Sequence, residues 1–203
     1  MHLRILIIVL IVLIGIIPST IFAQDTITFA TATPSLTATP TITPTTTPIP
    51  ELYIEPEKII IQAEDGTFLV GDFYMVDPLS PTIMLFHQLY TSRVSWEPVI
   101  GPLLGAHYNV LAVDVRGYGD STSSINWRKA IVDVQSWFNW VRDESGVRPD
   151  AISTMGSSMG STLAIVGCAN DALCKTAIAI SPGWDYYGIE LEDSLKIGLS
   201  NRP

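Results

Sequence analysis

The chain has 203 residues and a formal net charge of −9, with 20 acidic residues against 11 lysines and arginines. This acidic balance, without any run of basic residues, argues against nucleic acid and against anionic lipid as binding partners. The length fits one folded domain that carries additional terminal segments.

The first segment, residues 1–23, has the organisation of an export signal. A short basic start precedes an uninterrupted apolar run at residues 5–17, and small residues follow up to Ala23. This pattern predicts a secretory signal peptide that is cleaved after Ala23. If the apolar stretch extends over residues 5–22, it could instead serve as an uncleaved membrane anchor, so both interpretations stay open. Either one places the protein outside the cytoplasm, secreted or otherwise extracytoplasmic.

The second segment, residues 24–50, changes composition abruptly. Threonine and proline dominate it, and no charged side chain occurs between Asp25 and Glu51. Such a segment buries too little apolar surface to offset its chain entropy, so we predict a disordered linker. It could tether the folded part to a membrane or to the cell wall as a stalk, or it could be an inert spacer.

The third segment, residues 51–203, carries the pattern of a folded domain. Two strand-like runs at residues 58–63 and 68–76 flank the turn signal at 64–67. We therefore predict an antiparallel hairpin at the edge of a sheet.

Two continuous apolar runs come next, at residues 82–86 and 109–115. Runs of this kind predict strands that are buried on both faces of a sheet. Between them, residues 96–106 are predicted to form a helix, with Ser95 as the N-cap and Pro98 in the first turn.

The clearest helical pattern covers residues 127–141. Its apolar side chains recur at helical spacing and form one stripe, made of Trp127, Ile131, Val134, Phe138 and Val141. The stripe predicts a helix that covers one face of the sheet. After the following strand and helix, residues 175–181 are predicted to form a further buried strand.

Residues 151–166 contain the pattern G-x-S-x-G between a short apolar run and an apolar, alanine-containing segment. In a strand–turn–helix setting this pattern forms a nucleophile elbow. Gly156 and Gly160 would let the strand and the helix approach closely while the residue between them adopts a strained conformation. Ser158 is therefore the predicted nucleophile, although the pattern by itself also occurs by chance.

The order of these elements predicts an α/β fold, with a doubly wound, mostly parallel sheet and an N-terminal antiparallel hairpin. His87, Asp114, Ser158 and Ser181 each follow a predicted strand closely. Because reactive groups in such sheets collect at the carboxyl ends of the strands, one crevice could hold all four.

The two cysteines, Cys168 and Cys174, lie between the elbow helix and the next strand. In an exported protein they could form a disulfide, and two buried free thiols are the alternative. Their spacing is not a metal signature, and we expect neither a metal nor a cofactor.

Four segments then occur in an order that carries a family likeness: MLFHQ at residues 84–88, VDVRGYGDS at 113–121, GSSMG at 156–160 and ISPG at 180–183. Over about residues 57–203, the chain resembles an α/β hydrolase, closest to the dienelactone-hydrolase and prolyl-oligopeptidase-like esterase branches. The resemblance implies hydrolysis of a small-molecule ester or similar acyl compound without a cofactor.

The resemblance also implies roles for individual residues. Ser158 would attack the acyl carbonyl and form an acyl-enzyme. The backbone N–H groups of Gln88 and Met159 would form the oxyanion hole, although relatives more often have glycine where Gln88 stands. His87 would order this loop, and Asp114 with Arg116 would brace the next loop as a hydrogen-bonded pair.

A base for the serine is missing from the sequence. The fold supplies the acid and the histidine after the nucleophile, but the three histidines, His2, His87 and His107, all precede Ser158. In one interpretation the chain is a C-terminal truncation of an exported serine hydrolase, is inactive alone, and has its acid and histidine beyond Pro203. In the other, it is a non-catalytic, stalked surface protein that uses the hydrolase cleft for binding.

Overall fold

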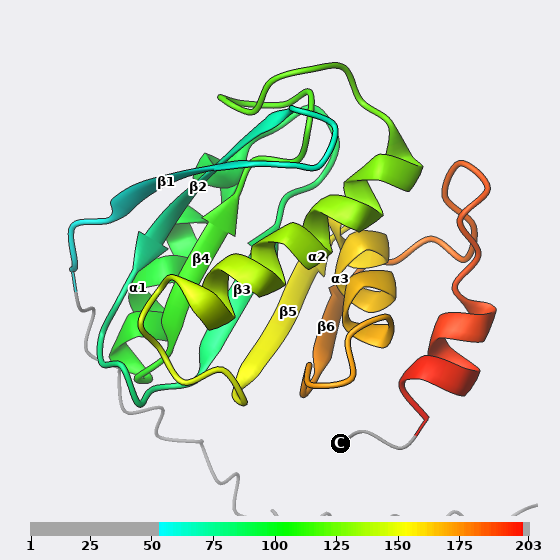
Figure 1. Cartoon of the computed structure of the whole chain (residues 1–203). Helices are drawn as coiled ribbons and strands as arrows, with labels where there is room; N and C mark the ends of the chain where they lie inside the picture. The colour runs from blue at the N-terminus through cyan, green and yellow to red at the C-terminus, as the bar shows by residue number, and fades with distance from the viewer. Residues whose placement is uncertain (1–52, 201–203) are drawn as a thin grey trace, which may run out of the picture. The chain divides into compact units, whose positions relative to one another are not determined.

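The computed structural model describes residues 53–200. The predicted leader (1–23) and linker (24–50) lie outside the described residues, so both stay predictions. The described residues form a six-stranded sheet with helices on both faces, in the strand order β1-β2-β4-β3-β5-β6 (Figure 1). The predicted fold class, a mostly parallel α/β sheet that begins with an antiparallel hairpin, is confirmed.

The strands are β1 (Glu57–Gln62), β2 (Phe68–Tyr74), β3 (Thr82–Phe86), β4 (Asn109–Val113), β5 (Ile152–Ser157) and β6 (Ala177–Ile180). β2 pairs antiparallel with both β1 and β4, whereas β4, β3, β5 and β6 run parallel to one another. Every residue of β3 and β4 is buried, as their continuous apolar runs predict.

The helices are α1 (Glu97–Gly105), α2 (Trp127–Asp143) and α3 (Met159–Ala169), with a 3-10 turn at Arg93–Trp96 and a π-helical turn at Ser194–Gly198. The prediction that Ser95 caps α1 is wrong, because the 3-10 turn precedes the helix and Trp96 occupies the cap position. The Ser95 hydroxyl donates to the Ser92 carbonyl instead, at 2.9 Å. Within residues 53–200, no helix combines the length and apolarity needed to cross a membrane.

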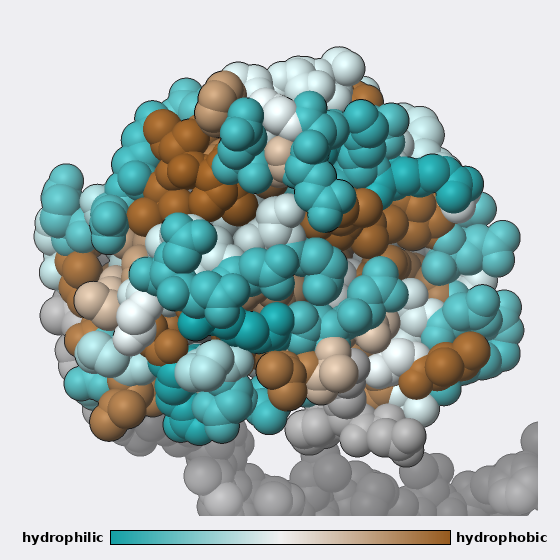
Figure 2. All heavy atoms as spheres, in the orientation of Figure 1, coloured by the Kyte–Doolittle hydropathy of each residue, from teal (hydrophilic) through white to brown (hydrophobic). Residues whose placement is uncertain are grey.

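The core has two layers, one on each face of the sheet. Residues such as Met84 and Phe86 pack with Trp137 of α2 and Leu163 of α3. On the opposite face, the alternate strand residues pack with α1, for example Leu85 against Leu104. The outer face of α2 is polar, and a band of hydrophilic side chains crosses this side of the molecule between apolar patches (Figure 2).

β6 is the less protected edge of the sheet. Its register places Ile178 beside Met155, on the face that α1 covers over β3 and β4. Ile178 and Ile180 are 40% and 41% exposed, on a face where Met155 of β5 still packs against the α1 cluster and β6 has no such cover from the described residues. The opposite side of β6, with Ala177 and Ala179, packs towards α3.

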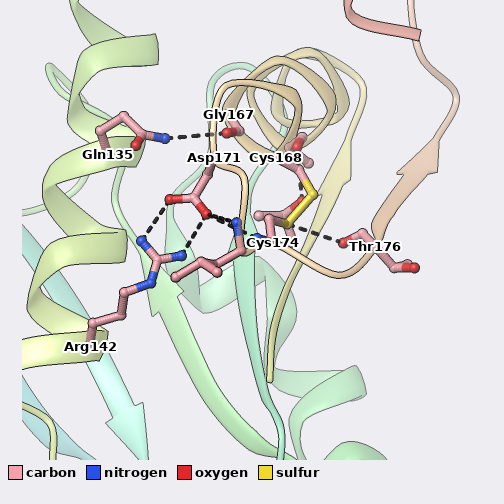
Figure 3. The surroundings of a disulfide bond; sticks show 10 residues. Gln135, Arg142, Gly167, Cys168, Asp171, Cys174 and Thr176 are labelled. Carbon is pink, nitrogen blue, oxygen red and sulfur yellow. Dashed lines mark hydrogen bonds and ion pairs between the residues drawn. A yellow bond between two sulfur atoms is a disulfide. The ribbon is translucent and has the colours of Figure 1, made fainter. Parts of the chain in front are cut away.

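A disulfide joins Cys168, near the end of α3, to Cys174, in the loop that leads to β6 (Figure 3). Asp171 lies between them and accepts two hydrogen bonds from Arg142 of α2, both at 2.6 Å. The same carboxylate accepts the N–H groups of Leu173 and Cys174, each at 2.9 Å. The loop before β6 is therefore tied to both α2 and α3.

Candidate active site

Ser158 stands at the junction of β5 and α3, in the strand–turn–helix setting that the sequence predicts. Its backbone has φ +50° and ψ −117°, a conformation that residues other than glycine rarely adopt. The N–H of Ser158 donates to the carbonyl of Ile180 at 2.8 Å, so the strained residue remains bonded to the end of β6. A non-glycine residue held in this way is typical of functional sites.

The two elbow glycines are explained by close backbone approach. A Cβ atom on Gly156 would overlap the carbonyl group of Gly160, which lies in the first turn of α3. A Cβ atom on Gly160 would overlap the carbonyl oxygen of Phe86, at the end of β3. Both positions therefore require glycine, and α3 begins in direct contact with β3.

Ser161 is a further polar residue at the elbow, which the sequence did not single out. Its buried hydroxyl lies 2.9 Å from the carbonyl of Gly156 and 2.7 Å from that of Ile180. Ser161 thus connects the end of β5, the start of α3 and the end of β6, the three segments that fix the position of Ser158.

The two predicted oxyanion donors come from neighbouring segments. Met159 is the first residue of α3, so its N–H has no partner one turn earlier in the helix and lies at the positive end of the helix dipole. Gln88 follows Phe86 and His87, whose carbonyl oxygens both face the Cα of Gly160. The fold thus brings the segments of Gln88 and Met159 to the same end of the sheet as Ser158.

His87 is fully buried and uses both ring nitrogens. Its Nε2 accepts the N–H of Val115 at 3.1 Å, so this nitrogen carries no proton. The proton is therefore on Nδ1, which donates to the carbonyl of Gln88 at 2.7 Å. Burial lowers the pKa of His87 and keeps the ring neutral. This geometry fits a role in ordering the loop after β3.

His107 lies at the opposite end of the sheet from Ser158 and is not placed to take its proton. It is exposed, with φ +64°, in the connection between α1 and the amino end of β4. Ser158 follows the carboxyl end of β5, which runs parallel to β4 through β3. Neither histidine of the described part of the chain is therefore placed to act as its base, and His2 lies outside that part.

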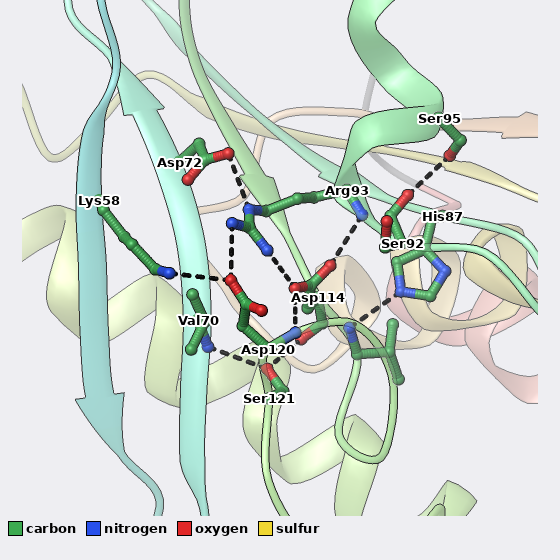
Figure 4. A network of polar contacts seen from close by, with 11 residues as sticks. Lys58, Val70, Asp72, His87, Ser92, Arg93, Ser95, Asp114, Asp120 and Ser121 are labelled. Carbon is green, nitrogen blue, oxygen red and sulfur yellow. Dashed lines mark hydrogen bonds and ion pairs between the residues drawn. The ribbon is translucent and has the colours of Figure 1, made fainter.

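Asp114, directly after β4, is fully buried and organises three segments (Figure 4). It accepts the backbone N–H of Arg93 and that of Asp120, both at 2.8 Å, together with the side chain of Arg93. The guanidinium of Arg93 also contacts Asp72 at 2.7 Å and Asp120 at 3.0 Å. Asp114 therefore braces the loop after β4 against the loop after β3.

The predicted pairing of Asp114 with Arg116 is wrong. The chain turns after β4 and directs Arg116 towards α2, where its guanidinium binds Asp133 through two nitrogens and Asp65 at 2.9 Å. The Asp114 partner is Arg93, 21 residues earlier. No local pattern in the sequence indicates either long-range pair.

Within residues 53–200, no cluster of three or more His, Cys, Asp or Glu side chains has an arrangement that could hold a metal ion. The described residues offer a half-buried serine in a strained turn, at the N-terminus of a helix.

Comparison with known proteins gives a family match. The sequence model for the alpha/beta hydrolase fold matches residues 81–199, which is more than half of the chain. The uncharacterised protein YfhR of Salmonella typhi is 28% identical over 127 residues, 57% of this chain and 44% of that protein. The putative hydrolase YtaP of Bacillus subtilis is 30% identical over 94 residues, 39% of this chain and 31% of that protein. The chain spans less than half the length of these relatives.

Solved structures give the same result for the fold. The esterase Pf2001 of Pyrococcus furiosus superposes with a TM-score of 0.59 and 30% identity, over 63% of this chain and 52% of that one. The alpha/beta hydrolase GrgF of Penicillium sp. sh18 has a TM-score of 0.59 and 20% identity, over 64% and 46% of the two chains. At this lower identity the second likeness shows the fold alone.

Proposed function

The chain belongs to the alpha/beta hydrolase fold family, and from this premise we propose that its full-length form is an exported serine hydrolase acting on small-molecule esters or similar acyl compounds. The observation that carries the proposal is the strained backbone of Ser158, held between two glycines at the N-terminus of α3. The likeness to the esterase Pf2001 of Pyrococcus furiosus supports an ester as the substrate. The narrower assignment to the dienelactone-hydrolase or prolyl-oligopeptidase-like branch stays a prediction.

In the proposed reaction, the Ser158 hydroxyl attacks the ester carbonyl, its proton passes to a base, and the alcohol leaves with that proton. The negative charge on the carbonyl oxygen develops beside the N–H groups of Met159 and Gln88. Water then hydrolyses the acyl-enzyme and regenerates Ser158. Losing one oxyanion donor typically costs about 10²–10³ in kcat, so these two peptides matter through their backbone.

We propose that the base and its acid lie in a further segment of the natural protein. Neither described histidine is placed to activate Ser158, because His87 is fully engaged and His107 lies at the other end of the sheet. The exposed face at Ile178 and Ile180 supports this proposal, since an additional strand and helix could cover it. The chain's share of its relatives' length is also consistent with a missing segment.

Export and tethering are proposals that rest on the sequence of residues 1–50. The disulfide between Cys168 and Cys174 supports a location in an oxidising compartment, where such bonds form and persist. Cleavage after Ala23 would release the protein, whereas retention of residues 5–22 would anchor it.

The test compares the product of the complete natural gene with residues 1–203 on p-nitrophenyl acetate. We expect turnover by the complete protein and a loss of about 10⁴-fold or more in kcat for Ser158→Ala. Ser157→Ala is the matched control, because this neighbouring serine precedes the strained position and should leave activity within about twofold. Residues 1–203 alone should give no Ser158-dependent turnover.

A non-catalytic surface protein that binds ligands in the hydrolase cleft is the second candidate. It is favoured by the lack of a base near Ser158 in the part of the chain that the structure describes. A complete gene product without Ser158-dependent hydrolysis, or a native reading frame that stops directly after Pro203, would favour this candidate and reject the enzyme.

A further inference from the structure

Residues 184–191, just after β6, form a small hairpin, which we call the aromatic hairpin. Tyr186 and Ile189 exchange two backbone hydrogen bonds of 3.1 Å, and Asp185 pairs with Glu190. Tyr187 and Gly188 form its tip with φ values of +52° and +75°. Positive φ at both central residues matches the two-residue turn that closes tight hairpins.

The part of the aromatic hairpin that is farthest from its tip packs against α3, the helix that follows Ser158. Ile189 and Leu191 are buried against Ile165 and Val166 of α3. Because α3 begins directly after Ser158, the hairpin and the nucleophile are positioned by the same helix.

The tip of the hairpin packs on aromatic rings. Tyr187 stacks on Trp127, the first residue of α2, with ring centres 5.4 Å apart and planes 11° from parallel. Tyr186 meets the same Trp127 edge-on at 5.1 Å and Tyr187 at 4.9 Å. Burial, followed by the nearby hydroxyls of Tyr187, Tyr118 and Tyr90, raises the pKa of Tyr186 to about 12.

Trp127, Tyr186 and Tyr187 form a cluster of contacting rings. Tyr118 and Tyr90 lie near enough for their hydroxyls to raise the pKa of Tyr186. We call these five residues the aromatic wall. Tyr90 lies in the loop after β3, Tyr118 in the loop after β4, and the hairpin follows β6. Ser158 follows β5, and β5 lies between β3 and β6 in the sheet. The residues of the wall therefore come from loops on both sides of the predicted nucleophile.

The wall is uncharged and partly open to solvent. Tyr187 and Tyr90 are 67% and 87% exposed, while the hydroxyl of Tyr186 is buried without a hydrogen-bond partner in the described residues. Burial and the neighbouring tyrosines raise the pKa of Tyr118, as they do for Tyr186. Exposed aromatic surface beside a reactive residue often marks a binding site.

We propose that the aromatic wall selects the substrate, so that the full-length enzyme prefers esters with an aromatic or similarly flat, uncharged group. This inference rests on the proposed function of Ser158, since it names the substrate class of that site. The exposed faces of Tyr187 and Tyr90 would contact the flat group while its ester bond lies at Ser158. Aromatic pairs add a small favourable contribution beyond area burial, equivalent to about 2- to 10-fold in affinity.

The experiment measures kcat/KM of the full-length protein for ethyl phenylacetate and ethyl butanoate, which share their alcohol and differ in the acyl group. We expect the wild type to favour the phenylacetate. Tyr187→Ala should reduce kcat/KM for the phenylacetate by about 10-fold and change the butanoate by less than about twofold. Tyr187→Phe, which keeps the ring, should retain the preference.

Tyr53→Ala is the matched control, because Tyr53 is an 81% exposed tyrosine outside the wall and should leave both rates unchanged. An equal loss of both rates in Tyr187→Ala, or no preference in the wild type, would overturn the inference. Thermal denaturation of each variant separates a selective effect from simple unfolding.

A binding measurement separates this inference from the proposed reaction. In the Ser158→Ala full-length variant, calorimetry should show tighter binding of ethyl phenylacetate than of ethyl butanoate, and adding Tyr187→Ala should remove the difference. Equal binding of the two esters would reject the aromatic wall as a selecting surface even if hydrolysis is found. Selective binding without any turnover in the wild type would reject the hydrolase proposal alone.

Discussion

The side chain of His87 connects the loop after β3 with the loop after β4. One ring nitrogen accepts from Val115 and the other donates to Gln88, so the neutral ring satisfies one backbone group in each loop. The N–H of Val115 cannot bond to a ring nitrogen that also carries a proton. A charged His87 would therefore break the contact that holds the two loops together.

We predict that this contact makes the stability of the chain depend on pH. Burial lowers the pKa of His87 below the ordinary value of 6.5, so the unfolded chain binds more protons than the folded chain just below pH 6.5. The free energy of unfolding should be fully retained above this pH and should fall as the pH drops towards the lowered pKa. Urea denaturation at about pH 7.5 and about pH 5.5 measures the change.

Two variants isolate the contribution of His87. His87→Gln removes the titrating group and should show a smaller decrease in stability between the two pH values than the wild type. His107→Gln, at the exposed histidine, should behave as the wild type does. A decrease of the same size in His87→Gln and in the wild type would contradict the assignment.

At the scale of elements, the elbow depends on α3 beginning in contact with β3. We predict that Gly160→Ala destabilises the chain by about 1–3 kcal/mol or more, because the added methyl group would overlap the Phe86 carbonyl and the backbone must shift. Thermal denaturation followed by circular dichroism measures the loss.

Gly183→Ala is the matched control for this prediction. A Cβ atom at Gly183 would find its nearest non-neighbouring atom 3.5 Å away, which is ordinary contact, and its φ is not positive. Its stability should stay within about 0.5 kcal/mol of the wild type. Equal stability of the two alanine variants would contradict the close packing of the elbow.

Local patterns in the sequence predict these elements well, because burial and turn chemistry act over a few residues. The apolar run at residues 82–86 coincides with β3, and the G-x-S-x-G pattern locates the turn at Ser158. The aromatic hairpin was not predicted, since its Tyr187-Gly188 tip lacks the usual Asn-Gly or Asp-Gly signal. Its stacking partner, Trp127, is separated from it by a strand, a helix and a further strand.

At the scale of the whole molecule, the two edges of the sheet differ in how they meet solvent. β1 carries Glu57, Lys58 and Gln62, polar side chains that discourage pairing with another strand. β6 consists only of alanine and isoleucine, and Ile178 and Ile180 are exposed on the face where β6 has no cover from the described residues. An apolar, exposed edge strand such as β6 is a template for pairing with a strand of another chain.

We therefore predict that residues 51–203, produced alone, form oligomers through β6. Light scattering after size-exclusion chromatography should show species larger than a monomer, and the double change Ile178→Lys and Ile180→Lys should shift them towards the monomer. Ile60→Lys is the matched control, because Ile60 is 60% exposed on β1, the opposite edge. A monomeric wild-type fragment would show that β6 needs no further cover. If Ile60→Lys dissociated the oligomers as well as the double change does, β6 would not be the interface.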